Sequence, residues 1–223
     1  MTTPRCGTLF HFTHVDNLPT ILEKDALLCD SQVQPLGLLG CEASDQEVKA
    51  RRRGRSVPCG PGGVVADYVP FYFAARSPMM YVLWKGSVAT FQRDHRDLVY
   101  LVTTVHGVTQ AGLPFVLSDR NAAVGVAEFA SDVAVLGDLG ASTPRSEFVD
   151  WPLMRSKYWN DTAERPDRME RRMAEFLVHQ RLPLGLITEV ATQSEQLRAR
   201  LEREFAAAGR TLHCNARPHW YYA

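Results

Sequence analysis

Short apolar segments that recur along the whole chain constrain its fold more than any other feature. Six segments rich in β-branched and aromatic residues have the length and composition of strands, at residues 8–12, 69–73, 98–105, 115–117, 174–178 and 186–191. Helices are expected between and after them, at about 45–53, 77–84 and 194–208. No apolar segment approaches the roughly 18 residues of a membrane span. The pattern predicts one mixed α/β domain without repeats or linkers.

Local signals refine this outline. Asp16 stands where an N-cap would, ahead of apolar residues at helical spacing, so a helix is expected from that point. Ser77 and Pro78 are typical of a cap and a first helical turn. By contrast, residues 121–166 are weakly periodic and are expected to form a long loop with helical pieces. Loops of that length within a compact domain are usually functional.

Charged residues are balanced in total but not in distribution. The 25 basic and 25 acidic side chains exclude a polybasic binder, and the zero balance alone argues against nucleic acid as a partner. However, five basic residues and no acidic one lie between Lys49 and Arg55, and residues 153–183 hold seven Lys or Arg against five Asp or Glu. A neutral total therefore excludes only a binder that depends on charge over its whole surface.

The cysteines and the first residues bear on location. The five cysteines are odd in number, widely spaced and without a C-x-x-C pair, so neither a disulfide framework nor a metal site is expected. We interpret them as reduced thiols of a cytoplasmic protein. Residues 1–8 lack the basic and apolar regions of a signal peptide.

Two segments in the first half of the chain could bind a ligand. His11, in an apolar strand, could offer its ring nitrogens to sugar hydroxyls, or it could be a hydrogen-bonded histidine of the core. Aromatic residues alternate along 68–73, ahead of the helix that Ser77 is expected to cap. They could wall a slot for a planar ring, although core packing would produce the same pattern.

Two charged features have alternative interpretations as well. The run Arg51-Arg52-Arg53-Gly54-Arg55 is either a solvated helix face or a phosphate-binding segment. Glu175 directly precedes the apolar residues 176–178. A carboxylate at that place is costly unless it is paired or used, so it is either functional or at an exposed strand edge.

The order of these segments is more specific than any one of them. A strand with a histidine, then Tyr72-Phe73-Ala74 with Ser77 and Tyr81, then a strand that begins with a glutamate resembles the layout of ADP-ribosyltransferases. The closer resemblance is to the DarT family of DNA ADP-ribosyltransferase toxins, in particular its thymidine-modifying branch. It rests on HFTHVDNLPTIL (11–22), DYVPFYFAARSPMMY (67–81), AGLPFVLSDR (111–120), Tyr158-Trp159, AEFLV (174–178) and the final WYY (220–222).

The resemblance implies a fold and a reaction. The fold is α+β, with a central split β-sheet flanked by helices in one domain over residues 1–223. Within it, about 8–118 would form the NAD-binding core, 119–174 the DNA loop, and 175–223 the catalytic strand and C-terminal elements. Such enzymes transfer ADP-ribose from the co-substrate NAD to a base of single-stranded DNA. No G-x-G-x-x-G follows the first strand, which argues against a hydride-transferring dehydrogenase.

The resemblance also implies roles for individual residues. Glu175 would stabilise the cationic ribose that forms when nicotinamide leaves. Arg52 would position substrate, since a pKa above about 12 makes arginine a poor base, although direct proton removal by Arg52 stays open. NAD contacts are expected from His11, Thr13, Asn17, Tyr72, Ser77 and Tyr81. The residue that stacks on nicotinamide stays open between the two tyrosines, Phe73 and Met80.

The remaining expectations concern partners. Contacts to single-stranded DNA are expected from Arg51, Arg53, Lys157, Tyr158, Trp159, Arg168, Arg171 and Arg172. The pair Tyr158-Trp159 would stack on unpaired bases or else anchor its own loop. The family is usually paired with a macrodomain antitoxin, DarG, which implies a role in a toxin–antitoxin system or phage defence. A transferase that modifies protein or RNA, and a catalytically silent nucleic-acid-binding module of the same fold, are the alternatives.

Overall fold

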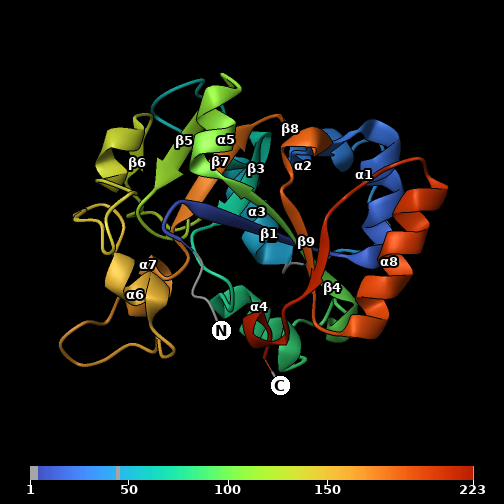
Figure 1. Cartoon of the computed structure of the whole chain (residues 1–223). Coiled ribbons are helices and arrows are strands. Elements are labelled where there is room, and N and C mark those ends of the chain that lie inside the picture. The colour runs from blue at the N-terminus through green and yellow to red at the C-terminus, as the bar shows by residue number, and fades with distance from the viewer. Residues whose placement is uncertain (1–4, 44–45, 223) are drawn as a thin grey trace.

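A large β-sheet forms the centre of the molecule (Figure 1). The computed structural model describes residues 5–43 and 46–222. Within these residues, eight strands form one sheet in the order β10-β9-β4-β1-β3-β7-β5-β6, and β2 and β8 form a separate pair. The strands are β1 (Thr8–His14), β2 (Ala26–Leu28), β3 (Tyr68–Tyr72), β4 (Leu98–Thr104), β5 (Phe115–Ser118), β6 (Phe129–Ala130), β7 (Glu175–His179), β8 (Arg181–Pro183), β9 (Glu189–Thr192) and β10 (Cys214–Ala216).

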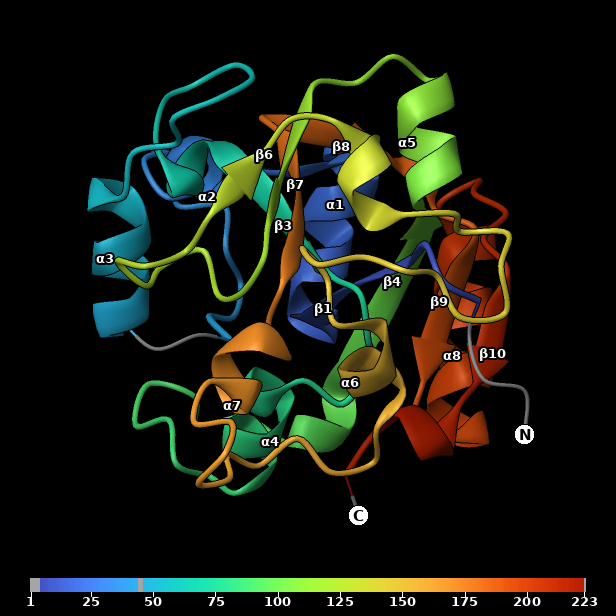
Figure 2. The same ribbon diagram turned by 90° about the vertical axis from the view of Figure 1, so that its left-hand side faces the viewer.

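Helices flank this sheet at both ends. In Figure 1, α8 lies beside β9 and β10 at one end, while α6 and α7 lie at the other, the side that faces the viewer in Figure 2. The helices are α1 (Leu18–Lys24), α2 (Asp30–Val33), α3 (Gln46–Gly54), α4 (Pro78–Trp84), α5 (Val105–Gln110), α6 (Trp151–Arg155), α7 (Arg168–Arg171) and α8 (Glu195–Ala207). Short 3-10 turns lie at 15–17, 65–67, 95–97, 133–136, 184–186 and 218–220.

The helix starts follow local hydrogen bonding. The predicted cap of α4 is confirmed, because Ser77 Oγ accepts a hydrogen bond from the Met80 N–H at 3.2 Å. The predicted start at Asp16 is wrong: a 3-10 turn comes first, in which the His14 ring accepts the Asp16 N–H, and α1 begins at Leu18. Asp45, the first residue of the helix expected at 45–53, lies outside the described residues.

The sheet is split between β1 and β3. Strand β1 pairs with β4 along seven residue pairs, but with β3 only at Phe10 and Tyr72. Pro70 lies in the middle of β3 and has no N–H to donate to a neighbouring strand. Its carbonyl instead accepts a hydrogen bond from the ring of His11 at 2.9 Å. The two strands therefore diverge where a proline and a histidine side chain replace regular backbone pairing, and the expected split sheet is confirmed.

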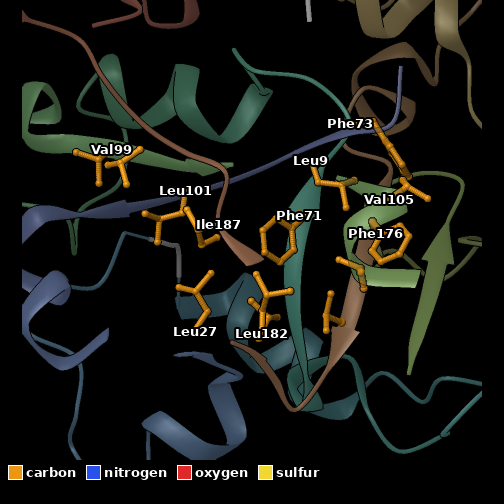
Figure 3. Close-up of a cluster of buried hydrophobic side chains, with 14 of the residues drawn as sticks. Leu9, Leu27, Phe71, Phe73, Val99, Leu101, Val105, Phe176, Leu182 and Ile187 are labelled. Carbon is orange, nitrogen blue, oxygen red and sulfur yellow. The ribbon is translucent and has the colours of Figure 1, made fainter. Parts of the chain in front are cut away.

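Each face of the sheet has its own apolar core. Along β1, Leu9 belongs to a cluster with Phe71 and Phe176 (Figure 3), while Phe10 belongs to a second cluster with Trp220. Successive side chains of a strand point to opposite faces, so this assignment follows from the strand period of two. Packing against these two cores holds strands β1 and β3 rigid, and with them His11 at the split.

Phe71 is fully buried at the centre of the first core. We expect Phe71→Ala to lower the free energy of unfolding by about 3–5 kcal/mol, since it removes ring contacts and leaves a cavity. Urea denaturation measures the change. The exposed Leu36 provides the control, because Leu36→Ala should change stability by less than about 0.5 kcal/mol. Equal effects of the two substitutions would contradict the assigned core.

The segment between β5 and β7 is largely irregular, as expected for residues 121–166. It contains only β6, one 3-10 turn and the short helices α6 and α7. All five cysteines are free thiols, as expected from their spacing. Of the helices in the described residues, none is both long and apolar enough to cross a lipid bilayer.

Candidate active site

Glu175 is the most deeply buried carboxylate of the site. It begins β7, where it lies opposite Tyr72 of β3 and Ser118 of β5, and its exposed fraction is 1%. Its two oxygens accept a pair of hydrogen bonds from the guanidinium of Arg52, both at 2.9 Å, and Oε1 accepts a third from the Ala122 N–H at 3.0 Å. An exposed strand-edge position is thereby excluded, and the carboxylate is held in one orientation by three donors.

Arg52 reaches Glu175 from helix α3. Burial by itself would lower the pKa of Arg52, but the adjacent carboxylate raises it above its ordinary value. The guanidinium is therefore a permanent cation in this pairing. A fork-to-fork pair of this kind fixes both partners in direction as well as in distance.

The rest of the arginine run is divided among different roles. Arg53 pairs with Asp30 at 2.8 Å, and Arg55 donates to the carbonyls of Gly125 and Ala127. Arg51 is exposed. The run is thus neither a uniformly solvated face nor a single phosphate cluster.

A cavity of about 400 Å³ opens at the split in the sheet. It is lined by β1, β3, α1, α3 and α4 together with the segment 38–43. Arg52 lines this cavity, whereas Glu175 does not line it and lies behind the guanidinium. The size and the largely apolar lining, with a few polar groups, are typical of a site for an organic ligand.

His11 lines the cavity and is also hydrogen-bonded to the core. Because the Pro70 carbonyl can only accept, the ring Nδ1 of His11 carries the proton in this hydrogen bond. Burial, and to a smaller extent the charge of Arg52, lowers the pKa of His11. The ring is therefore neutral near pH 7, and Nε2 keeps a lone pair that can accept from a hydroxyl.

This depressed pKa makes stability depend on pH. The unfolded chain takes up a proton at His11 near its ordinary pKa of 6.5, while the folded state resists it, so stability is lost as the pH falls below that value. We expect the thermal midpoint of His11→Asn to fall less steeply than that of the wild type between about pH 7 and pH 5. His14, whose pKa burial also lowers, contributes a second part of the slope. Parallel curves for the two proteins would contradict the neutral His11.

Three further predicted NAD contacts also line the cavity. Asn17 donates to Thr13 Oγ1 at 2.9 Å and to the Cys41 carbonyl at 2.8 Å, while its own oxygen accepts the Cys41 N–H. These bonds fix the wall formed by the segment 38–43. Tyr72 stacks against Phe12 with ring centroids 6.2 Å apart. Burial, and after it the charge of Glu175, raises the pKa of Tyr72, so its phenol stays protonated.

The other two predicted NAD contacts lie elsewhere. Ser77 is 1% exposed and caps α4, and it does not line the cavity. Tyr81 packs edge-on against Trp159 and Tyr222, at centroid distances of 5.7 and 5.2 Å. The helical period explains this correction, because positions 78, 79 and 82 of α4 face the cavity and position 81 does not.

Several residues expected to contact DNA make hydrogen bonds within the protein. Trp159 is 8% exposed and donates to the Tyr222 hydroxyl, which corresponds to the loop-anchor alternative. Arg168 donates to the carbonyls of Tyr158 and Asn160, and Arg171 pairs with Asp167. Arg172 is not an exposed cation: it is buried, and it donates to the carbonyls of residues 75, 153 and 156. Sequence reasoning expected the three arginines to contact phosphates, and it left Trp159 open between base stacking and loop anchoring.

Lys157 and Tyr158 remain available at the surface. The Tyr158 ring is 67% exposed, and the Lys157 ammonium lies 5.3 Å from its centroid. Both lie on the segment between α6 and α7. An exposed aromatic ring beside an exposed cation is the arrangement that binds unpaired nucleotides in other proteins.

Sequence reasoning predicted neither the hydrogen bond from the Ala122 N–H to Glu175 nor the ion pairs of Asp30. A backbone donor leaves no trace in side-chain chemistry, although the preceding block 111–120 had marked this region. Asp30 pairs with both Lys49 and Arg53 and so ties α3 to the body of the protein. The contact spans 23 residues of sequence and has no local pattern.

Comparisons with known proteins agree with this geometry. The family model "ssDNA thymidine ADP-ribosyltransferase, DarT" matches residues 10–222. A DNA ADP-ribosyl transferase of Thermus sp. (strain 2.9) is 36% identical over 224 residues, covering 99% of each chain. A DNA ADP-ribosyl transferase–DNA ADP-ribosyl glycohydrolase fusion protein of Thermosipho africanus is 29% identical over 80 residues, which are 36% of this chain and 20% of that protein.

Solved structures of the Thermus sp. 2.9 protein have the same fold. The complex of Thermus DarT with ADP-ribosylated single-stranded DNA superposes with a TM-score of 0.86, at 32% identity over 100% of this chain and 99% of that one. The complex of the same protein with NAD+ gives a TM-score of 0.82, at 32% identity over 99% and 100% of the two chains.

Proposed function

This chain belongs to the DarT family, and from that premise we propose that it transfers ADP-ribose from NAD to thymine in single-stranded DNA and releases nicotinamide. One observation carries the assignment of the site: the carboxylate of Glu175 is held by the Arg52 fork beside a cavity in the split sheet. Residues 8–118 supply most of that cavity, and the segment 119–174 supplies the exposed ring and cation for DNA.

In the proposed reaction, the bond between the ribose C1′ and the nicotinamide nitrogen breaks, and nicotinamide leaves with the electron pair. Negative charge fixed beside the ribose stabilises the cation that develops. Glu175 supplies that charge, and because Arg52 stands between it and the cavity, part of the fork must open when substrate binds. The thymine ring nitrogen then forms the bond to C1′, and its proton passes to solvent water.

Arg52 acts in this scheme by charge and position. Its pKa is raised by the adjacent carboxylate, so it holds its proton and cannot serve as a base while the pair is intact. A permanent cation at this place can orient a phosphate of NAD or a carbonyl of thymine. His11, Thr13, Asn17 and Tyr72 line the remaining cavity and are proposed to bind NAD.

The reaction has a direct test. Purified protein is incubated with NAD and, separately, with single-stranded oligonucleotides, RNA and cell protein, and the products are analysed by mass spectrometry. We expect an added ADP-ribose on thymine of the DNA alone. ADP-ribose found only on protein or RNA would favour a transferase that modifies one of those targets. No added ADP-ribose on any substrate would favour a catalytically silent binding module.

Tyr158 provides a test of DNA binding. We expect Tyr158→Ala to weaken binding to a thymine-containing single strand by about 1–3 kcal/mol, since one stacked base loses its platform. Fluorescence anisotropy measures the affinity for DNA, and calorimetry should show unchanged affinity for NAD. Leu36→Ala removes another exposed apolar side chain, one that lines neither cavity, and serves as the comparison. An unchanged DNA affinity in Tyr158→Ala would remove this ring from the proposed interface.

The setting follows from the substrates. NAD and single-stranded DNA meet in the cytoplasm of a bacterium, and we propose that location for this chain. The Thermosipho relative is fused to a DNA ADP-ribosyl glycohydrolase. We therefore propose a partner with that activity, an antitoxin that removes the modification.

A further inference from the structure

A second cavity, of about 230 Å³, lies on the other side of the segment that joins β3 to α4. Phe10 touches both cavities, and Phe73, Trp151 and Trp220 give the second one an aromatic lining. Its lining includes six basic side chains, Arg5, Arg76, Arg155, Lys157, Arg172 and His219. Among the described residues, no Asp or Glu lines it. The concentration of cations without a carboxylate predicts an anionic ligand.

Three buried donors around this cavity lack an acceptor. Among the described residues, seven buried side-chain atoms have no hydrogen-bond partner, and three of them are Arg76 Nε, Arg172 Nε and Trp220 Nε1. All three side chains line the second cavity. A buried donor without a partner costs free energy, and most such groups in proteins are satisfied. Because these three nitrogens are buried beside one cavity, an acceptor from outside the chain can complete them when the cavity wall shifts as the ligand binds.

Arg172 carries the strongest electrostatic argument. Its exposed fraction is 4%, and its terminal nitrogens donate to three backbone carbonyls, with no carboxylate as partner. Burial lowers its pKa to about 10. A buried guanidinium that is still charged near pH 7 and has no counter-ion is stabilised by an anion.

Arg76 is held in place by the fold. Its φ of 56° lies in the left-handed region, which a non-glycine residue rarely adopts. The backbone is fixed there by two tyrosines: the Arg76 N–H donates to Tyr100 Oη at 3.1 Å, and its carbonyl accepts from the Tyr222 hydroxyl at 2.7 Å. The guanidinium lies 4.6 Å from the centroid of the Tyr222 ring. The side chain is therefore positioned before any ligand arrives.

We propose that this second cavity binds a phosphodiester group of the DNA strand that is modified, with Arg76, Arg172 and Trp220 as its donors. The position favours DNA, because Lys157 of the cavity is followed by the exposed Tyr158 ring, and Arg172 lies three residues before Glu175. The inference rests on the proposed function, since it assigns one anchor for its DNA substrate. The aromatic lining suits the sugar or base next to the anchored phosphate.

A scan with neutral backbone linkages tests the proposal. Single-stranded oligonucleotides that carry one methylphosphonate at each successive linkage are bound to the wild type, to Arg76→Gln and to Arg203→Gln. Arg203 is an exposed residue of α8 and gives the same charge change away from the cavity. In the wild type and in Arg203→Gln we expect one linkage whose neutralisation weakens binding about tenfold, the loss typical of one hydrogen bond to a charged group.

In Arg76→Gln we expect weaker binding to unmodified DNA by about the same factor, and a further loss at that linkage that is smaller than in the wild type, because Arg172 and Trp220 still contact the phosphate. If Arg76→Gln has a lowered thermal midpoint, the same scan is made with Trp220→Phe, which keeps an aromatic ring but lacks the N–H. The same pattern of binding losses is expected for it. Equal losses at every linkage in all proteins, or full competition by inorganic phosphate at the concentration of DNA, would overturn the inference alone. Absence of any binding of single strands by the wild type would overturn the proposed function too.

Discussion

Glu175→Gln is expected to lower the rate of ADP-ribose transfer by about a hundred- to a thousandfold, the range for loss of one group that stabilises charge in a transition state. The substitution keeps the shape of the side chain and one acceptor for the Ala122 N–H. It removes the negative charge beside the ribose. Transfer is measured with NAD and a thymine-containing single strand, under conditions in which both substrates saturate.

Binding separates this result from a loss of folding. Glu175→Gln should still bind single-stranded DNA, because Glu175 is buried and lies outside the proposed DNA contacts. Glu189 of β9, which pairs with Arg217 at 2.7 Å, is the matched control, and Glu189→Gln should keep the wild-type rate. A wild-type rate in Glu175→Gln would refute the catalytic assignment. An equal loss of rate in the two variants would show that the loss comes from disturbing strands of the sheet rather than from removing a catalytic charge.

The strands of the fold could be predicted because each is long enough to carry its own composition. Residues 98–105 and 174–178 are apolar and β-branched or aromatic, and they match β4 and β7 closely. The pair β2 and β8 was not predicted, since each strand has only three residues and pairs with a partner far along the chain. The start of α1 was misplaced because the His14 ring, rather than Asp16, caps the turn that precedes the helix, and Asp16 lies inside that turn.

The site could be predicted as a set of residues but not as a geometry. The resemblance identified Arg52 and Glu175, yet nothing in the sequence indicates a direct pair across 123 positions. A cationic side chain looks the same on the surface and in the interior, which is why Arg172 was expected on the outside. The face of α4 that meets the cavity depends on how the helix is placed on the sheet, and this placement turned Tyr81 away from the cavity.

Arg52→Gln is expected to lower the transfer rate by about a hundredfold and the free energy of unfolding by about 3–5 kcal/mol. The destabilisation arises because a carboxylate with 1% exposure loses its only ionic partner among the described residues. Arg52→Lys keeps a cation but cannot form two parallel hydrogen bonds, so we expect it to recover stability in part and little of the rate. The exposed pair of Arg200 and Glu204 is the control, since Arg200→Gln should cost less than about 1 kcal/mol.

The double substitution Arg52→Gln with Glu175→Gln decides whether the pair acts as a unit. With both charges removed, no uncompensated ion remains buried, so the double variant should be more stable than Arg52→Gln alone. Its transfer rate should be no lower than that of Glu175→Gln by more than a small factor, because Arg52 can orient NAD or thymine well only when Glu175 has fixed the direction of its guanidinium. Additive losses in both stability and rate, measured by urea denaturation and by transfer to DNA, would instead show two independent residues and contradict the mechanism proposed for the fork.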